Sequence, residues 1–178
     1  MKILALIGSP RKGGNTDILV EEILKGCIKK GYEIEKLYLY DYDIEPCIDC
    51  RACKKGDLVC PLYDGMHEIF YTKMEEADLI IFGTPLYWYG PTGKMKLLID
   101  RMRPFVANRK LEGKKFILVT PSEEGAEACG PLVDMFNMSF DYLGMRFIGT
   151  LLAKAYEKGE ITENQEAIKK AYEFGISL

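Results

Sequence analysis

The chain has 178 residues, with 24 Lys or Arg against 27 Asp or Glu and a formal net charge of −3. This length suits a single domain with a substantial core, and the acidic balance without a basic block argues against a nucleic-acid-binding surface. No apolar run approaches the roughly 20 residues that span a bilayer, and the apolar start ends at Gly8-Ser9-Pro10 without a cleavage site, so we expect a soluble, cytoplasmic protein.

Short apolar runs alternate with segments of helical periodicity, which predicts an α/β protein with a parallel sheet. The predicted strands are residues 2–7, 33–39, 78–83, 115–120 and 146–152. Helices are predicted over residues 15–30, from Pro91 onward, from Cys129 to a stop at Gly144, and from Thr162, where Thr162 and Gln165 form a capping box.

Residues 41–65 are the one long stretch without clear periodicity, and they contain four of the six cysteines. Structureless loops of this length are uncommon in compact domains and usually functional. We expect a Cys-rich insertion here, called the cysteine loop below, and something other than a hydrophobic core must hold it. Cysteines in a reducing compartment indicate metal ligands or free thiols rather than disulfides.

The turn after the first predicted strand is the most informative motif. Residues 8–16 join that strand to a helix and combine three glycines with short polar side chains, which is typical of a phosphate site at a helix N-terminus. A dinucleotide fingerprint is absent, and Gly14 stands where a Walker A loop needs lysine. The terminal phosphate of a mononucleotide is the ligand that fits.

Two further loops complete the predicted site. With strand order 2-1-3-4-5, ligands bind between strands one and three, where residues 84–90 carry Thr-Pro-Leu-Tyr-Trp-Tyr-Gly, and residues 120–125 could close the far side. Backbone groups along a flat heterocycle and three aromatic side chains indicate FMN, although the aromatic triplet could equally pack at an interface. The predicted cofactor-binding residues are Ser9, Arg11, Lys12, Gly13, Gly14, Asn15, Thr16, Thr84, Pro85, Leu86, Tyr87, Trp88, Tyr89, Gly90, Thr120, Ser122 and Gly125.

The chain resembles the flavodoxin-like NAD(P)H-dependent FMN reductase family over nearly its whole length. The matching stretches are residues 8–16, 77–87 and 93–101. The resemblance implies a single flavodoxin-like domain over residues 1–178, a three-layer sandwich with a five-stranded parallel sheet of order 2-1-3-4-5 and helices on both faces. It also implies homodimers or homotetramers with flavin near an interface, FMN phosphate held by Ser9, Arg11, Asn15 and Thr16, and the ring edge held by residues 85–90.

The four cysteines of the loop form a second constellation, C-x2-C-x2-C-x6-C followed by proline. This spacing resembles the compact motif of the iron–sulfur flavoproteins, a branch of that family with one [4Fe–4S] cluster per subunit, and is related to the bacterial ferredoxin run. A structural zinc site, a C-x-x-C redox pair and simple loop packing are the alternatives. The predicted metal ligands are Cys47, Cys50, Cys53 and Cys60.

No nucleophile, triad or catalytic acid is evident, so flavin would carry the chemistry and no catalytic residue is predicted. His67 is expected at the surface or at a helix cap, and Cys27 and Cys129 are expected to be buried. The favoured hypothesis is an oxidoreductase passing electrons between FMN, the cluster and a small carrier such as ferredoxin. The alternatives are a cluster-free NAD(P)H-dependent FMN or quinone reductase, with NAD(P)H as a transient donor, and a non-catalytic FMN redox sensor.

Overall fold

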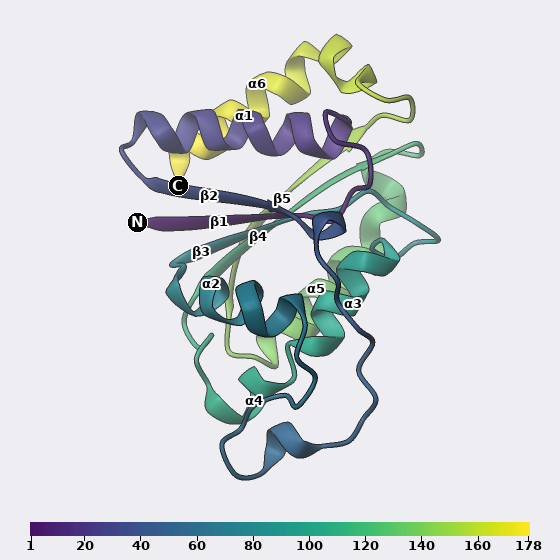
Figure 1. The fold of residues 1–178 in the computed structure, drawn as a ribbon. Helices are drawn as coiled ribbons and strands as arrows, with labels where there is room; N and C mark the ends of the chain where they lie inside the picture. The colour runs from purple at the N-terminus through teal and green to yellow at the C-terminus, as the bar shows by residue number, and fades with distance from the viewer.

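The computed structural model describes all 178 residues and places five parallel strands in the order β2-β1-β3-β4-β5 (Figure 1). This order confirms the predicted sheet. The strands are β1 (Lys2–Ile7), β2 (Glu33–Tyr38), β3 (Leu79–Gly83), β4 (Lys115–Ser122) and β5 (Arg146–Lys154). From β1 the chain first moves to β2 at one edge of the sheet, and it then returns past β1 to add β3, β4 and β5 toward the opposite edge. The strand order therefore reverses between β1 and β3.

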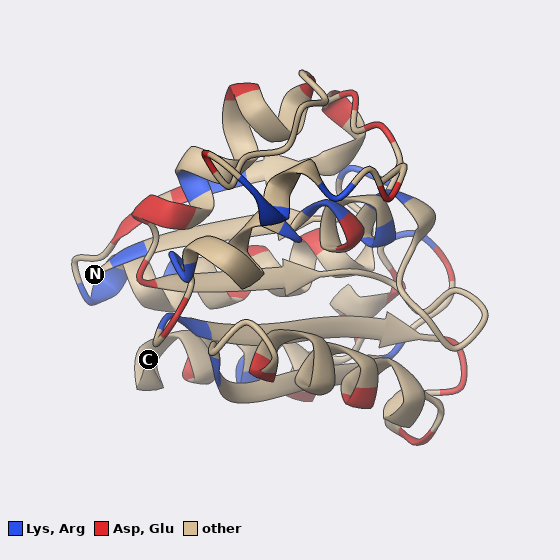
Figure 2. Ribbon diagram, turned by 90° about the horizontal axis from the view of Figure 1, so that it is seen from below, with Lys and Arg blue, Asp and Glu red and all other residues tan.

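Side chains that alternate along the central strands divide the core into two layers. Leu4, Phe82 and Leu118 belong to one buried cluster, while their neighbours Ala5 and Ile81 belong to the other. Strands buried on both faces therefore appear as nearly continuous apolar runs in the sequence. Figure 2 agrees, because charged residues lie mainly on helices and loops and the strands are largely uncharged.

Helices cover both faces of the sheet (Figure 1). Helices α1 and α6 pack together on one face, and α2, α3, α4 and α5 lie on the other. None of the helices has the length and apolar character needed to cross a membrane. Their bounds are α1 (Asn15–Lys29), α2 (Tyr71–Glu76), α3 (Gly93–Arg101), α4 (Pro104–Asn108), α5 (Gly130–Asp141) and α6 (Gln165–Ser177).

Two predicted helix starts are wrong by a few residues because a better cap lies nearby. Helix α3 begins after Thr92, whose side chain accepts a hydrogen bond from the Met95 N–H, rather than at Pro91. Helix α6 begins after Asn164, which caps the Ala167 N–H, so the predicted Thr162 capping box does not form. The stop at Gly144 is confirmed by its left-handed backbone, with φ of 72°.

The carboxyl ends of β1 and β3 are tied together where the strand order reverses. The Gly8 N–H donates to the Gly83 carbonyl at 2.7 Å, and the Thr92 hydroxyl donates to the Gly8 carbonyl at 2.5 Å. A Cβ at Gly8 would lie 2.9 Å from the Cβ of Met95, so only glycine permits this approach. The loops that leave this edge therefore start from fixed positions.

Candidate FMN cleft and cysteine loop

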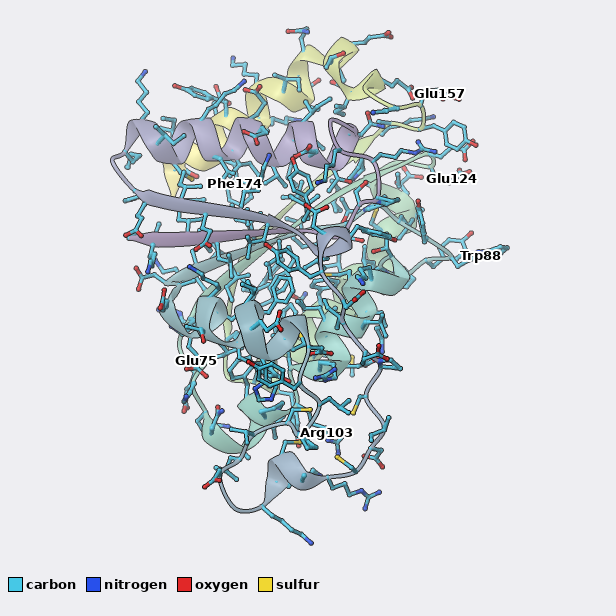
Figure 3. The ribbon with its side chains drawn as sticks, in the orientation of Figure 1. Glu75, Trp88, Arg103, Glu124, Glu157 and Phe174 are labelled. Carbon is cyan, nitrogen blue, oxygen red and sulfur yellow. The ribbon has the colours of Figure 1, made fainter.

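A cleft opens at the carboxyl edge of the sheet, between the loops that follow β1, β3, β4 and β5. Figure 3 shows three of these loops at the same edge, marked by Trp88, Glu124 and Glu157. Eight of the predicted cofactor-binding residues line this cleft together with four others. The full lining is Ser9, Arg11, Asn15, Thr16, Pro85, Leu86, Tyr87, Pro121, Ser122, Glu123, Ala155 and Tyr156.

The loop after β1 presents hydrogen-bond donors to the cleft. The Ser9 hydroxyl accepts from the Arg11 N–H at 3.2 Å, which leaves its own O–H free to donate. The first-turn N–H groups of α1 have no carbonyl partner within the helix and add the positive end of its dipole. Asn15 is more constrained, because its side chain donates to the Glu157 carbonyl and accepts from the Ile161 N–H. We therefore expect Asn15 to offer a phosphate its backbone N–H.

The middle of this loop, Lys12 to Gly14, stabilises the loop and does not line the cleft. The Gly13 N–H donates to Asp17 at 2.7 Å, and the Gly14 N–H donates to the Arg11 carbonyl at 2.9 Å. Lys12 points elsewhere, because its Nζ pairs with Asp41 at 2.6 Å. Gly13 has a φ of 67°, a conformation that glycine adopts without steric cost. These three residues shape the loop, and their direct contact with FMN stays a prediction.

The loop after β3 ends in a tight hairpin. Tyr87 and Gly90 exchange two backbone hydrogen bonds, and the residues between them, Trp88 and Tyr89, have φ of 50° and 60°. Left-handed backbone at two bulky residues is unusual and costs conformational energy. Trp88 is 98% exposed and points away from the body of the molecule (Figure 3). Only Tyr87 of the aromatic triplet lines the cleft, so a ring-covering role for Trp88 and Tyr89 stays a prediction.

Behind the cleft, buried hydroxyl groups brace the loops. Thr84 is fully buried and accepts from the Thr92 N–H at 3.1 Å, while the Ser122 hydroxyl donates to the Gly125 carbonyl at 2.7 Å. Thr120 is also fully buried, and its hydroxyl oxygen has no partner. Because buried polar atoms are nearly always paired, an unpaired hydroxyl next to Pro121 of the cleft fits a site that binds a polar ligand.

Sequence reasoning missed the contribution of the loop after β5. Ala155 and Tyr156 line the cleft, and the Tyr156 carbonyl accepts from Arg11 Nη1 at 3.2 Å. The signal was available, because all parallel strands deliver their following loops to the same edge. The predicted site includes only the loops after the first, third and fourth strands.

The cysteine loop lies away from the α1–α6 layer, on the far side of the sheet (Figure 1). Between Tyr42 and Gly65 the only regular element is one short 3-10 turn, Ala52–Lys54. All four cysteines line one hollow, although no three of the chain's His, Cys, Asp or Glu side chains are arranged to hold a metal ion. Cys47 and Cys50 are exposed, whereas Cys53 is buried. Burial raises the pKa of the Cys53 thiol, and nearby Cys60 adds to this while Arg103 opposes it.

A buried ion pair holds the ends of the cysteine loop. Arg101, at the end of α3, is only 1% exposed and pairs with Asp64 at 2.6 Å and 3.1 Å. Its terminal nitrogens also donate to the carbonyls of Glu45 and Leu62, and Asp64 accepts from the N–H groups of Glu45 and Met66. This network supplies the anchor that the sequence left unidentified.

The same pair predicts an acid-sensitive component of stability. Burial disfavours the Asp64 carboxylate, but hydrogen bonds from Arg101 and from two backbone N–H groups outweigh it, so the pKa of Asp64 lies below its ordinary value. A lowered folded-state pKa gives stability that is present above the unfolded value of about 3.9 and is lost as pH falls through the folded value.

We therefore expect the unfolding free energy to fall more steeply with acidification in the native chain than in Asp64→Asn. Urea denaturation from pH 7 down to about pH 2 measures both curves, which should diverge below about pH 5. Equal slopes would show that Asp64 titrates alike in the folded and unfolded chains.

The remaining candidates have structural roles. The His67 ring contacts the Cys60 carbonyl through Nε2 and stacks on Tyr63, so it supports the cysteine loop rather than capping a helix at the surface. Cys27 and Cys129 are fully buried, as predicted, and burial raises the pKa of Cys27 to about 11. Neither thiol is ionised near neutral pH, so neither is a ready nucleophile.

Comparison with known proteins places this geometry in a family. The family model of NADPH-dependent FMN reductases matches residues 1–157, which include every residue that lines the cleft and the whole cysteine loop. The chain belongs to the NADPH-dependent FMN reductase family. It is therefore a flavin-dependent oxidoreductase, and the family is the one that the sequence motifs predicted.

Individual proteins are similar to this chain in sequence or in fold. An iron-sulfur flavoprotein of Methanocaldococcus jannaschii is 42% identical over 114 residues, which are 64% of this chain and 58% of that protein. Another, from Archaeoglobus fulgidus, is 38% identical over 165 residues, 92% of this chain and 75% of that one. The NAD(P)H:quinone oxidoreductase from Methanothermobacter marburgensis has the same fold, with a TM-score of 0.78, 16% identity and coverage of 99% and 95%.

Proposed function

We propose that this protein passes electrons between FMN in the cleft, a [4Fe–4S] cluster in the cysteine loop and a small redox carrier such as ferredoxin. The observation that carries the proposal is one hollow lined by all four cysteines of the C-x2-C-x2-C-x6-C run. Thiolates are the usual ligands of such clusters. The names of the M. jannaschii and A. fulgidus relatives support the same assignment. The chain spans only 58% of the first of these, so the activity and partners of the whole protein remain part of the proposal.

The residues of each site have distinct tasks in this proposal. Bound FMN supplies one- and two-electron chemistry, and the cluster supplies one-electron chemistry. Ser9 and the first-turn N–H groups of α1 bind the phosphate, Arg11 adds a positive charge, and Pro85 to Tyr87 lie along the ring. Cys47, Cys50, Cys53 and Cys60 hold the iron.

Anaerobic purification followed by iron, acid-labile sulfide and flavin analysis tests the proposal. About four irons and four sulfides per chain, with one FMN, are expected. Zinc, or no metal after reconstitution with iron and sulfide, would reject the cluster. In that case the family description favours the second candidate, an NADPH-dependent reductase that uses bound FMN alone. Turnover of NADPH with a diffusing acceptor measures that activity.

Replacing Cys50 with alanine is expected to remove the cluster without removing FMN. Cys50 is exposed in the cysteine loop and does not line the FMN cleft, so loss of its thiolate removes one of four iron ligands only. Iron content and the broad visible absorption should fall sharply, while the flavin bands persist. Ile48→Ala, an exposed neighbour in the same hollow, is the matched control. Unchanged iron in Cys50→Ala would show that Cys50 is not a ligand.

A further inference from the structure

Two arginines line the same hollow as the four cysteines, and each has a buried nitrogen without a partner. They are Arg101 and Arg103, which lie on either side of the junction between α3 and α4. The Nε atoms of both are buried, and neither donates to any acceptor. Unpaired buried donors are rare in folded proteins, and a charged donor is the costliest kind to leave unpaired. Two arginines of one wall therefore keep a donor that an acceptor bound beside them would satisfy.

The two guanidinium groups differ in how far their charge is balanced. Arg101 makes a bidentate ion pair with Asp64, so its positive charge is largely neutralised. This ion pair anchors the cysteine loop. Arg103 has only Asp49 nearby, with 3.8 Å between its Nη2 and the carboxylate, beyond hydrogen-bond distance. Asp49 is itself paired more closely with Arg51, at 3.1 Å. Arg103 therefore brings a nearly unbalanced positive charge to the hollow.

The backbone fixes where this charge lies. Arg103 immediately precedes Pro104, the first residue of α4, and Pro104 also lines the hollow. Arg103 has helical backbone, with φ of −54° and ψ of −34°, and its carbonyl accepts from the Val106 N–H at 3.2 Å, so Arg103 enters the wall from the hydrogen-bonded start of α4. Its side chain is 39% exposed, which places the Nε inside the wall while the end of the group reaches the surface.

We propose that Arg103 sets the reduction potential of the cluster, by donating from its buried Nε to a cluster or cysteine sulfur and by balancing negative charge. This inference rests on the proposed function. Reduction brings one electron and one extra negative charge into the hollow, and no bond forms or breaks. The electron comes from reduced flavin or from a reduced carrier, and that donor is oxidised by one electron. A fixed positive charge favours the more negative state, as do hydrogen bonds to sulfur, so both raise the potential.

Arg103→Gln tests the inference, because glutamine keeps an amide N–H but removes the charge. Arg109→Gln is the control. Arg109 is an exposed arginine that follows the last residue of α4, and it pairs with Glu112. Both variants are reconstituted anaerobically, and their cluster potentials are measured by redox titration with electron paramagnetic resonance. Arg103→Gln should make one-electron reduction at least about tenfold less favourable than in the control, a change of about 59 mV for one electron. Equal potentials in the two variants would overturn the inference.

The variant Arg103→Lys distinguishes the effect of the lost charge from an effect on folding of the cysteine loop. If Arg103→Gln fails to hold iron, a lysine variant that holds iron at nearly the native potential supports the inference, and a lysine variant that also loses iron overturns it. Failure of the proposed function looks different. Native protein without iron after reconstitution rejects the cluster and this inference together, whereas native protein with four irons and an unshifted Arg103→Gln rejects this inference alone.

Discussion

Replacing Ser9 with aspartate is expected to weaken FMN binding at least about 100-fold, which corresponds to about 2.8 kcal/mol. Ser9 is 5% exposed, lines the cleft after β1 and has a hydroxyl free to donate. A carboxylate there replaces a donor with a negative charge facing the phosphate. Two unit charges about 4 Å apart repel by about 4 kcal/mol at an effective dielectric constant of about 20, so the estimate is conservative.

Titration of flavin-free protein with FMN, followed by flavin fluorescence, measures the change. Ser177→Asp introduces the same charge at an exposed position near the end of α6 and should bind FMN as the native chain does. Ser9→Ala should give an intermediate loss, because it removes one donor without adding repulsion. If Ser9→Asp still binds FMN stoichiometrically at native affinity, the phosphate lies elsewhere.

The strands and the first two loops of the cleft could be predicted because local sequence determines them, whereas the strand order followed from the family resemblance. Central strands such as β1 and β3 are buried on both faces, so their apolar runs are unbroken and hard to mistake. The glycines and short polar residues after β1 are by themselves enough to predict a phosphate loop. Helix starts were less certain, because Asn164 and Thr92 compete with nearby residues for the same capping role.

The parts that escaped prediction depend on contacts between distant segments. Asn15 has the right chemistry for a phosphate ligand, yet its side chain is held by Glu157 and Ile161, more than 140 residues away. Trp88 belongs to an aromatic triplet that suggests ring cover, but the hairpin turns it to solvent. The Arg101–Asp64 pair joins positions separated by 37 residues, and no local pattern links them. Residue type identifies candidates, whereas side-chain direction is set by the tertiary fold.

Replacing Arg101 with methionine is expected to cost about 3–5 kcal/mol of unfolding free energy, the usual result of leaving a buried charge without its partner. Asp64, with its side chain 5% exposed, would keep its two backbone N–H donors but lose both guanidinium contacts. The carbonyls of Glu45 and Leu62 would lose a donor as well. The cysteine loop should open first, because these contacts are what tie it to α3.

Urea denaturation and limited proteolysis at the cysteine loop measure the two effects. Arg109→Met is the matched control, since Arg109 and Glu112 are both more than half exposed and such pairs contribute at most about 1 kcal/mol. The double variant Arg101→Met/Asp64→Leu distinguishes charge from packing. It should recover part of the lost stability, because the uncompensated carboxylate is gone, without restoring protection of the loop from protease. If Arg101→Met is as stable and as protease-resistant as the control, the loop must be held by other contacts, and its order cannot depend on the buried ion pair.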